Sequence, residues 1–200
     1  MIAMPSLVLG RPSPSSPAAR ARQAAELGAT WMHVEADQAA PGNWAALAGI
    51  LDSGLQVQFA GGARSLTQVQ QLLDLGVERV AVRPPLLDPA WLREATHLFA
   101  GRVLADVAAG GTLAPACKGL ALAGLLTDLA SAPAQRRAWP NLPLHVSGLA
   151  DAQALQTAHE AGAAVAILRE GTPELVQEKA YEAYPAPPAL QVLRSRDEEE

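Results

Sequence analysis

Two glycine turns with neighbouring arginines are the residues best suited to chemistry, and they suit the binding of a phosphate group. The first turn lies in Phe59-Ala-Gly-Gly-Ala-Arg-Ser65, and Ser147-Gly148 forms a weaker copy later in the chain. Backbone amides in such turns, at the start of a helix, bind anions. Gly61, Gly62, Ser147 and Gly148 are therefore candidate phosphate contacts. Arg64 is a candidate ligand contact, although a solvated arginine at a helix start is the plainer alternative.

Arg83 and Arg169 form a second pair of candidates, each at the end of an expected strand. They lie 86 positions apart, as do Gly62 and Gly148. A guanidinium group presents a planar fork of donors that matches a phosphate. The pair could therefore clamp phosphate groups near Gly62 and Gly148. Alternatively, the two side chains fill space or extend into solvent.

The elements that position these residues repeat along the chain. The segments 62–76 and 148–162 align without a gap, and each predicts a strand, a glycine turn, an amphipathic helix and a second strand. A strand–helix–strand unit repeated half a chain apart is expected from a duplicated half-barrel. Such barrels build their sites at the carboxyl ends of the strands, where both turns lie.

The sequence predicts an α/β fold, a (βα)8 TIM barrel that is trimmed around its fifth and sixth βα units. One domain is expected over residues 1–184, with a disordered tail that is rich in proline and acidic residues over 185–200. Residues 108–119 read as a loop, 120–127 as a strand and 173–183 as the last helix. With the fifth helix lost, we expect Leu120, Leu122, Leu125 and Leu126 to be partly exposed or covered by a partner subunit.

Composition limits the possible partners. The net charge of −5 and the absence of a basic face argue against nucleic acid. One cysteine, Cys117, cannot form an internal disulfide or a cysteine metal cluster, and no signal peptide or membrane span is apparent. We expect a cytoplasmic protein with no membrane partner, no metal and no cofactor, which binds a phosphorylated small molecule. A homo-oligomer or a complex with a partner subunit is a further hypothesis.

Several short motifs, in the expected order, resemble the histidine-biosynthesis barrels. These are the family of ProFAR isomerase (phosphoribosylformimino-aminoimidazole carboxamide ribotide isomerase) and the cyclase subunit of imidazole glycerol phosphate synthase. The Gly-Gly-x-Arg-Ser turn and the Lys118-Gly119 pair make the isomerase the closer of the two. The resemblance covers about residues 4–183 and rests on these segments: Glu26-Leu-Gly-Ala-Thr-Trp-Met-His-Val34, Asn43, Gln58-Phe-Ala-Gly-Gly-Ala-Arg-Ser65, Leu75-Gly-Val-Glu-Arg-Val80 and Thr127-Asp-Leu129.

The resemblance implies a catalytic pair of which half is missing. Family members use one aspartate as general base and another as general acid to open a phosphoribosyl ring. Asp128 matches the acid, although it could equally be a polar residue that caps the next turn, and Asp106 matches a further family aspartate with the same alternative. The position of the base falls on Val8, which cannot accept a proton.

The phosphate sites implied by the resemblance are also altered. The family binds two phosphates through glycine turns after strands three, four, seven and eight. In this chain Ala60 and Ser147 each replace a glycine, and Arg83 and Arg169 stand where glycines are expected.

Three hypotheses follow for the function. The first is a weakly active or non-catalytic barrel that binds a phosphorylated metabolite. The second is an active isomerase, an intramolecular aldose–ketose isomerase of the Amadori type, in which Glu35 or Asp37 replaces the base. The third is a structural or regulatory barrel that acts through protein contacts.

Overall fold

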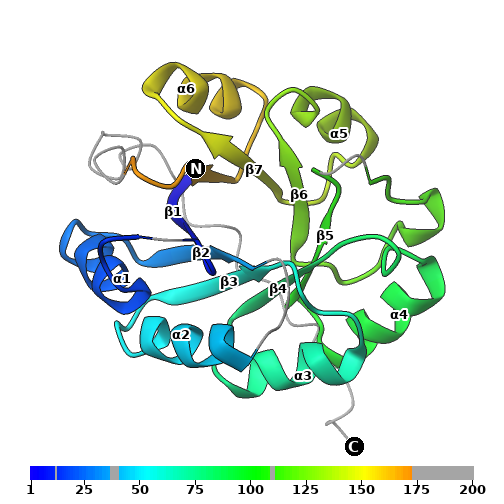
Figure 1. Cartoon of the computed structure of the whole chain (residues 1–200). Coiled ribbons are helices and arrows are strands. Elements are labelled where there is room, and N and C mark those ends of the chain that lie inside the picture. Colours follow the sequence, from blue (N-terminus) through cyan, green and yellow to red (C-terminus); the bar gives the residue numbers. More distant parts are fainter. Residues whose placement is uncertain (12, 37–40, 109–110, 173–200) are drawn as a thin grey trace, which may run out of the picture.

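Eight parallel strands close into a barrel in the order in which they occur in the chain. The structure is a computed structural model, which describes residues 1–11, 13–36, 41–108 and 111–172 (Figure 1). The strands are β1 (Ile2–Val8), β2 (Trp31–Glu35), β3 (Gln56–Ala60), β4 (Arg79–Val82), β5 (Val103–Asp106), β6 (Gly124–Asp128), β7 (Leu144–Leu149) and β8 (Val165–Leu168). β8 pairs with β1, which closes the barrel and confirms the predicted fold.

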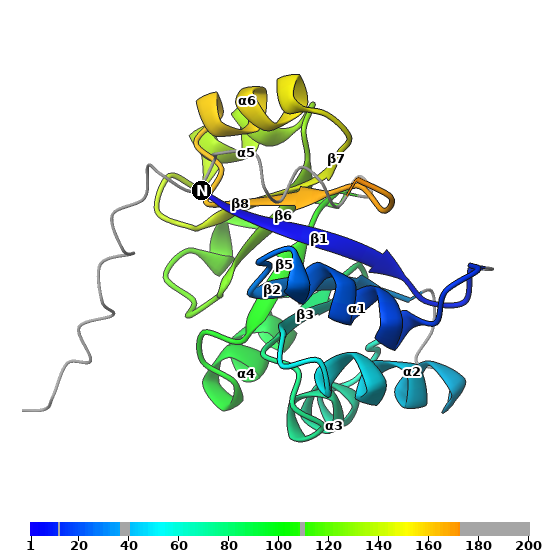
Figure 2. The same ribbon diagram turned by 90° about the vertical axis from the view of Figure 1, so that its left-hand side faces the viewer.

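Helices surround the barrel, as Figure 1 shows. They are α1 (Pro17–Glu26), α2 (Pro41–Leu51), α3 (Leu66–Asp74), α4 (Pro89–Leu98), α5 (Ala132–Ala138) and α6 (Ala152–Glu160). Between β5 and β6 the described chain has a single 3₁₀ turn, η1 (Pro115–Cys117), where the sequence predicted a lost helix. The turned view in Figure 2 shows β1 and β8 side by side, with α1 below them. No described helix has the length and apolarity that crossing a membrane would need.

The internal repeat predicted from the sequence is present in the structure. Helices α3 and α6 have nine residues each and are offset by 86 positions, as are β4 and β8. Ser65 and Asp151 occupy the same position in the two copies, and each caps its helix through its side chain. Gly62 and Gly148 both have positive φ, 76° and 82°, a conformation that favours glycine.

The barrel interior combines a small apolar cluster with buried polar side chains. Met4, Ala60, Ala81, Leu104, Leu126, Val165 and Ile167 form the apolar part. Two polar side chains lie on the same inner face as this cluster. Gln58 lies two residues before Ala60 on the same strand, so both side chains point inward. His145 is the register partner of Leu126 and therefore points inward as well. Both polar residues are buried, with His33 beside Gln58.

The expectation of an exposed leucine face was wrong. Leu122, Leu125 and Leu126 are buried, and Leu120 is partly buried. Two features explain the difference. Leu126 points into the barrel, and Leu122 and Leu125 belong to the main core cluster, which also contains Leu113 and Cys117 from the segment between β5 and β6. A short turn therefore replaces the helix as a cover, and this face no longer argues for a partner subunit.

Two element boundaries also differ from the predictions. β6 begins at Gly124 because residues 120–123 form a tight turn, in which the amide of Leu122 donates to the carbonyl of Leu120. The sequence predicted a helix that starts at Asn43 and ends near Leu51, whereas α2 begins at Pro41, two residues earlier. The predicted helix over 173–183, the tail over 185–200 and Asp37 lie outside the described residues.

The buried His145 should make the fold sensitive to acid. Burial, with smaller contributions from Arg79 and His33, lowers its pKa from 6.5 to about 3. Below pH 6.5 the unfolded chain therefore binds a proton that the folded chain does not. The free energy of unfolding should be constant above that pH and fall by roughly 1 kcal/mol per pH unit down to about pH 5.

Urea unfolding across this pH range tests the effect, with His145→Gln as the variant that cannot titrate at this position. The parent protein should lose stability faster than the variant as the pH falls. Equal slopes for the two proteins would contradict the assignment.

Candidate functional site

The carboxyl ends of the eight strands bring most of the predicted residues to one end of the barrel, which we call the mouth. Val8, Asp106 and Asp128 are the last residues of β1, β5 and β6. Arg83 and Arg169 directly follow β4 and β8. Gly61 and Gly62 directly follow β3, and Ser147 and Gly148 lie near the end of β7, so these residues also belong to the mouth. Arg64 lies farther along the first turn, and Asp37 lies outside the described residues.

Val8 and Glu35 lie side by side at the mouth. They are register partners on the adjacent strands β1 and β2. Val8 lies an even number of residues after Met4, which points into the barrel, so its side chain has the same direction. At the position where the sequence led us to expect a base, the side chain is therefore apolar, with a carboxylate on the next strand.

Charged and polar groups hold Glu35 in place. Its Oε1 lies 3.6 Å from His33 Nε2 and 3.7 Å from a terminal nitrogen of Arg83. Both distances exceed those of a hydrogen bond, so the contacts are electrostatic. His33 holds the pKa of Glu35 below its ordinary value, Arg83 and Arg11 add to this effect, and burial opposes it. Glu35 is therefore a carboxylate at neutral pH.

Beneath Glu35, a buried pair fixes the imidazole of His33. Gln58 Nε2 lies 3.0 Å from His33 Nδ1. With Nδ1 accepting from the amide, the proton of the neutral ring is on Nε2, which faces Glu35. The sequence analysis missed this support. The alternation of Trp31, His33 and Glu35 along β2 was the available signal, because it places all three side chains on one face.

Arg83 is bound by two carboxylates at the mouth. Its Nε donates to Asp106 Oδ2 at 2.5 Å, and Glu35 lies on its other side. Asp106 is fully buried, and its second oxygen accepts the amide of Ala108 at 3.0 Å. The Arg83 guanidinium lies beside the first turn, 3.7 Å from where a Cβ on Gly61 would be. Arg83 therefore lies beside the first turn with two acidic partners, which were not predicted from the sequence.

The two glycine turns differ in the space around them. A Cβ on Gly61 would lie 2.2 Å from the carbonyl oxygen of Ala36, so only glycine fits there. A Cβ on Gly148 would meet nothing within 4 Å. The hydroxyl of Ser147 donates to the carbonyl of Thr127 at 3.2 Å. The first turn is therefore packed against the chain at Gly61, and the second leaves space at Gly148.

Asp128 caps the turn that follows it. One of its oxygens accepts the amide of Ser131 at 2.8 Å, and the other accepts the Ser131 hydroxyl at 3.2 Å. This is the contact expected of a capping residue, although the carboxylate remains partly exposed at the mouth. Arg64 is exposed, and its amide donates to the side chain of Gln68.

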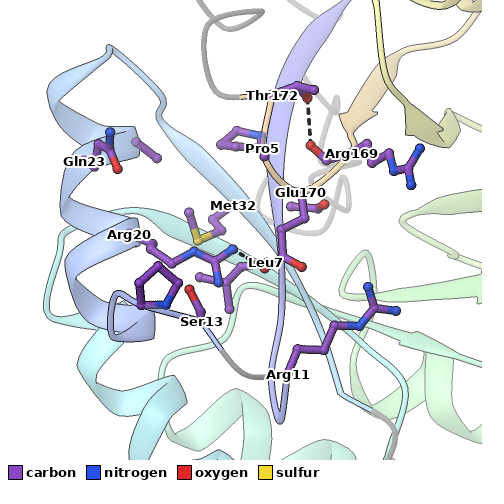
Figure 3. Close-up of a pocket in the computed structure, with 14 residues that line it drawn as sticks. Pro5, Leu7, Arg11, Ser13, Arg20, Gln23, Met32, Arg169, Glu170 and Thr172 are labelled. Atoms are coloured by element: carbon purple, nitrogen blue, oxygen red, sulfur yellow. Dashed lines mark hydrogen bonds and ion pairs between the residues drawn. The ribbon is translucent and has the colours of Figure 1, made fainter.

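Arg169 is exposed at the rim, beside a cavity outside the barrel. The cavity measures about 350 Å³ and lies between β1, α1 and the loop after β8. Figure 3 shows Arg20 meeting Glu170 from the α1 side, whereas the guanidinium groups of Arg11 and Arg169 lie on the other side of β1. Arg11 and Arg169 thus line the cavity from the side of β1 opposite to Arg20.

The described residues contain no group of three or more histidine, cysteine or acidic side chains arranged to hold a metal ion. The mouth has carboxylates and guanidinium groups. This set can bind hydroxyl groups and an anion, and it can exchange protons with them.

Comparison with known proteins is consistent with this geometry. The family model described as "Histidine biosynthesis protein" matches residues 11–123, more than half of the chain. The chain belongs to this family. The match includes β2 to β5 and the first glycine turn, with Glu35, Arg83 and Asp106.

Curated relatives place the chain closer to the isomerase branch of this family. It is 41% identical over 97 residues to the 1-(5-phosphoribosyl)-5-((5-phosphoribosylamino)methylideneamino)imidazole-4-carboxamide isomerase (ProFAR isomerase) of Methylobacterium nodulans, which covers 46% of the chain and 38% of that protein. The same isomerase of Paramagnetospirillum magneticum is 37% identical over 103 residues, 48% of the chain and 43% of the relative. The matched segments thus span less than half of either relative.

A solved structure with low sequence identity shares the fold. The HpcH/HpaI aldolase of Desulfitobacterium hafniense DCB-2 superposes with a TM-score of 0.66 at 14% identity, over 87% of this chain and 88% of that one. At this identity the likeness extends to the barrel fold and not to the reaction.

Proposed function

We propose that this isomerase-like barrel binds a phosphorylated metabolite at its mouth and catalyses ProFAR isomerisation weakly or not at all. The observation that carries the proposal is Val8 at the end of β1, where its side chain points to the mouth and cannot accept a proton. A general base typically contributes about 10²–10⁴-fold to a rate. Its loss leaves a binding site with little chemistry.

Two features support binding. The turn at Gly148 leaves open space, and the exposed Arg169 stands at the end of the neighbouring strand β8. Charge-assisted hydrogen bonds from a guanidinium group and from backbone amides are the common means of holding a phosphate. The relationship to phosphoribosyl isomerases favours a sugar phosphate as the ligand.

Binding is tested by titrating the protein with ribose 5-phosphate, and with ribose as the control, while the melting temperature is recorded. We expect stabilisation by the phosphate ester and none by ribose, because a ligand that binds the folded state alone raises its stability. The effect should weaken at high salt if the site is open to solvent. No stabilisation by the ester at millimolar concentration would refute the binding proposal.

A second candidate function is favoured by the position of Glu35. Its carboxylate is the register neighbour of Val8, and β2 and β6 lie on opposite sides of the barrel, so Glu35 and Asp128 face each other across the mouth. An isomerase that uses Glu35 as base would show slow turnover that Glu35→Gln abolishes. Turnover that survives this substitution would eliminate Glu35 as the base.

A further inference from the structure

We propose that Gln58 and His33 are positioning residues, which hold the carboxylate of Glu35 at the mouth as the proton acceptor of a weak isomerisation. The inference rests on the second candidate function, in which Glu35 replaces the missing base, and it names the residues that prepare Glu35 for that role. It follows from the way in which three polar side chains are connected, and from two buried polar atoms among them that have no partner.

Glu35 is held in place without a hydrogen bond. The contacts from His33 Nε2 and from Arg83 both reach the same oxygen, Oε1, at 3.6 and 3.7 Å. Both are longer than a hydrogen bond, and the carboxylate accepts none from the residues that the structure describes. The side chain is also 39% exposed. The carboxylate is therefore directed by its neighbours, while its oxygens stay available to a ligand at the mouth.

Gln58 acts on Glu35 through the imidazole of His33. The two residues Gln58 and His33 are register partners on β3 and β2, and the amide nitrogen of Gln58 lies 3.0 Å from Nδ1. The amide donates to Nδ1, so the proton of the neutral ring is on Nε2, the atom that faces Glu35. Without the amide, the ring proton could lie on either nitrogen, and an Nε2 without a proton would repel the carboxylate.

Two buried atoms of this connected group have no hydrogen-bond partner among the described residues. They are Gln58 Oε1 and His33 Nε2, in side chains that are 0% and 1% exposed. Buried polar atoms without partners destabilise a fold, so apolar side chains would serve better if the pair only filled space. Departures of this kind from the local rules are expected at functional sites. The two unpartnered atoms therefore favour a role of the pair at the mouth.

The groups that surround Glu35 favour its ionised form. His33 on the same strand lowers its pKa, burial opposes this effect, and Arg83 after β4 and Arg11 after β1 lower the pKa further. The register partner of Glu35 on β3 is Ala60, which carries no charge. An ionised carboxylate is the form that can take a proton from a ligand.

The proton transfer balances with the two carboxylates of the mouth. After Asp128 has given its proton to open the sugar ring, Glu35 takes the proton from C2, and the electron pair of that bond forms a double bond between C1 and C2. Glu35 then returns the proton to C1, while the C2 hydroxyl becomes a carbonyl and its proton passes to Asp128. Both carboxyl groups thus return to their starting states.

Nuclear magnetic resonance of the full chain, labelled with ¹⁵N in histidine and ¹³C in glutamate, tests the positioning. In the parent protein the proton of His33 should lie on Nε2, and the pKa of Glu35 should be below its ordinary value. Gln58→Met removes the amide and keeps a side chain of similar shape, so both ring forms of His33 should appear and the pKa of Glu35 should rise.

His145→Gln is the matched control, because it changes another buried polar side chain of the barrel interior. It should leave the His33 and Glu35 signals as they are in the parent protein. A His33 proton on Nδ1 in the parent would overturn the positioning, and this result does not depend on whether a variant folds. Unchanged His33 and Glu35 signals in folded Gln58→Met would overturn it as well.

Turnover of the ProFAR substrate tests the role of Glu35 as proton acceptor. Gln58→Met should lower kcat by up to about 100-fold with KM nearly unchanged, which is the cost of displacing a reacting group by about 1 Å. His145→Gln should retain the kcat of the parent protein. If the parent protein binds ribose 5-phosphate but shows no turnover, Glu35 is not a proton acceptor, while the proposed binding function stands. If the ester does not bind, the proposed function fails, and the His33 signals still decide the positioning.

Discussion

Replacing Val8 with aspartate should raise the rate of ProFAR isomerisation by about 10²–10⁴-fold over the parent protein, the usual contribution of a general base. Val8 ends β1, and its side chain has the inward direction of Met4. An aspartate there would present its carboxylate at the mouth, with Asp128 on β6 available as the acid. The rate is measured by following product formation from the purified substrate.

Val8→Asn is the matched control, because asparagine has the shape of aspartate and cannot accept the proton. Its rate should equal that of the parent protein. If Val8→Asp were no faster than Val8→Asn, the absent base would not be what limits catalysis. The altered phosphate turns would then be the remaining explanation for the low rate.

Arg83→Met should destabilise the fold by about 3 kcal/mol, because it leaves a buried carboxylate without its cation. Asp106 is fully buried, and its hydrogen bond from Arg83 is 2.5 Å long. We expect the lower end of the known range because Arg83 is 38% exposed and water can partly replace it. Urea unfolding gives the change in the free energy of unfolding.

A double variant separates the loss of the pair from the loss of packing. Arg83→Met combined with Asp106→Leu removes both charges and should recover most of the lost stability. A loss below about 1 kcal/mol in Arg83→Met alone would mean that Arg83 is not needed to compensate Asp106. Arg83 would then be freer to act as the phosphate clamp suggested by the sequence.

The features predicted correctly from the sequence are those that depend on short, local patterns of residue types. The 86-residue offset placed α3, α6, β4 and β8 because each copy carries the same glycines and the same apolar spacing. The approximate strands could be read in the same way, whereas the family resemblance assigned Val8, Asp106 and Asp128 to the strand ends. Periodicity and turn residues are local signals, so no knowledge of distant contacts was required.

The contacts that were missed depend on strand register. Arg83 and Asp106 are 23 residues apart, and His33 and Gln58 are 25 apart, so neither pairing is visible in the chain. The prediction that Leu122 and Leu125 lack a cover from their own chain failed for a related reason. These leucines share the core cluster with Leu113 and Cys117, which lie in a segment without helical or strand periodicity. The positions of these side chains along the strands could be predicted from the sequence, but their hydrogen-bond and ion-pair partners could not.

The most direct test of the account is the turnover of the ProFAR substrate by the parent protein, measured at ligand concentrations that saturate binding in calorimetry. The account predicts that the protein binds the phosphate ester while product formation stays at or barely above the uncatalysed level, since Val8 stands where the base should be. Sustained turnover at saturation, comparable to that of an isomerase with both carboxylates, would contradict it.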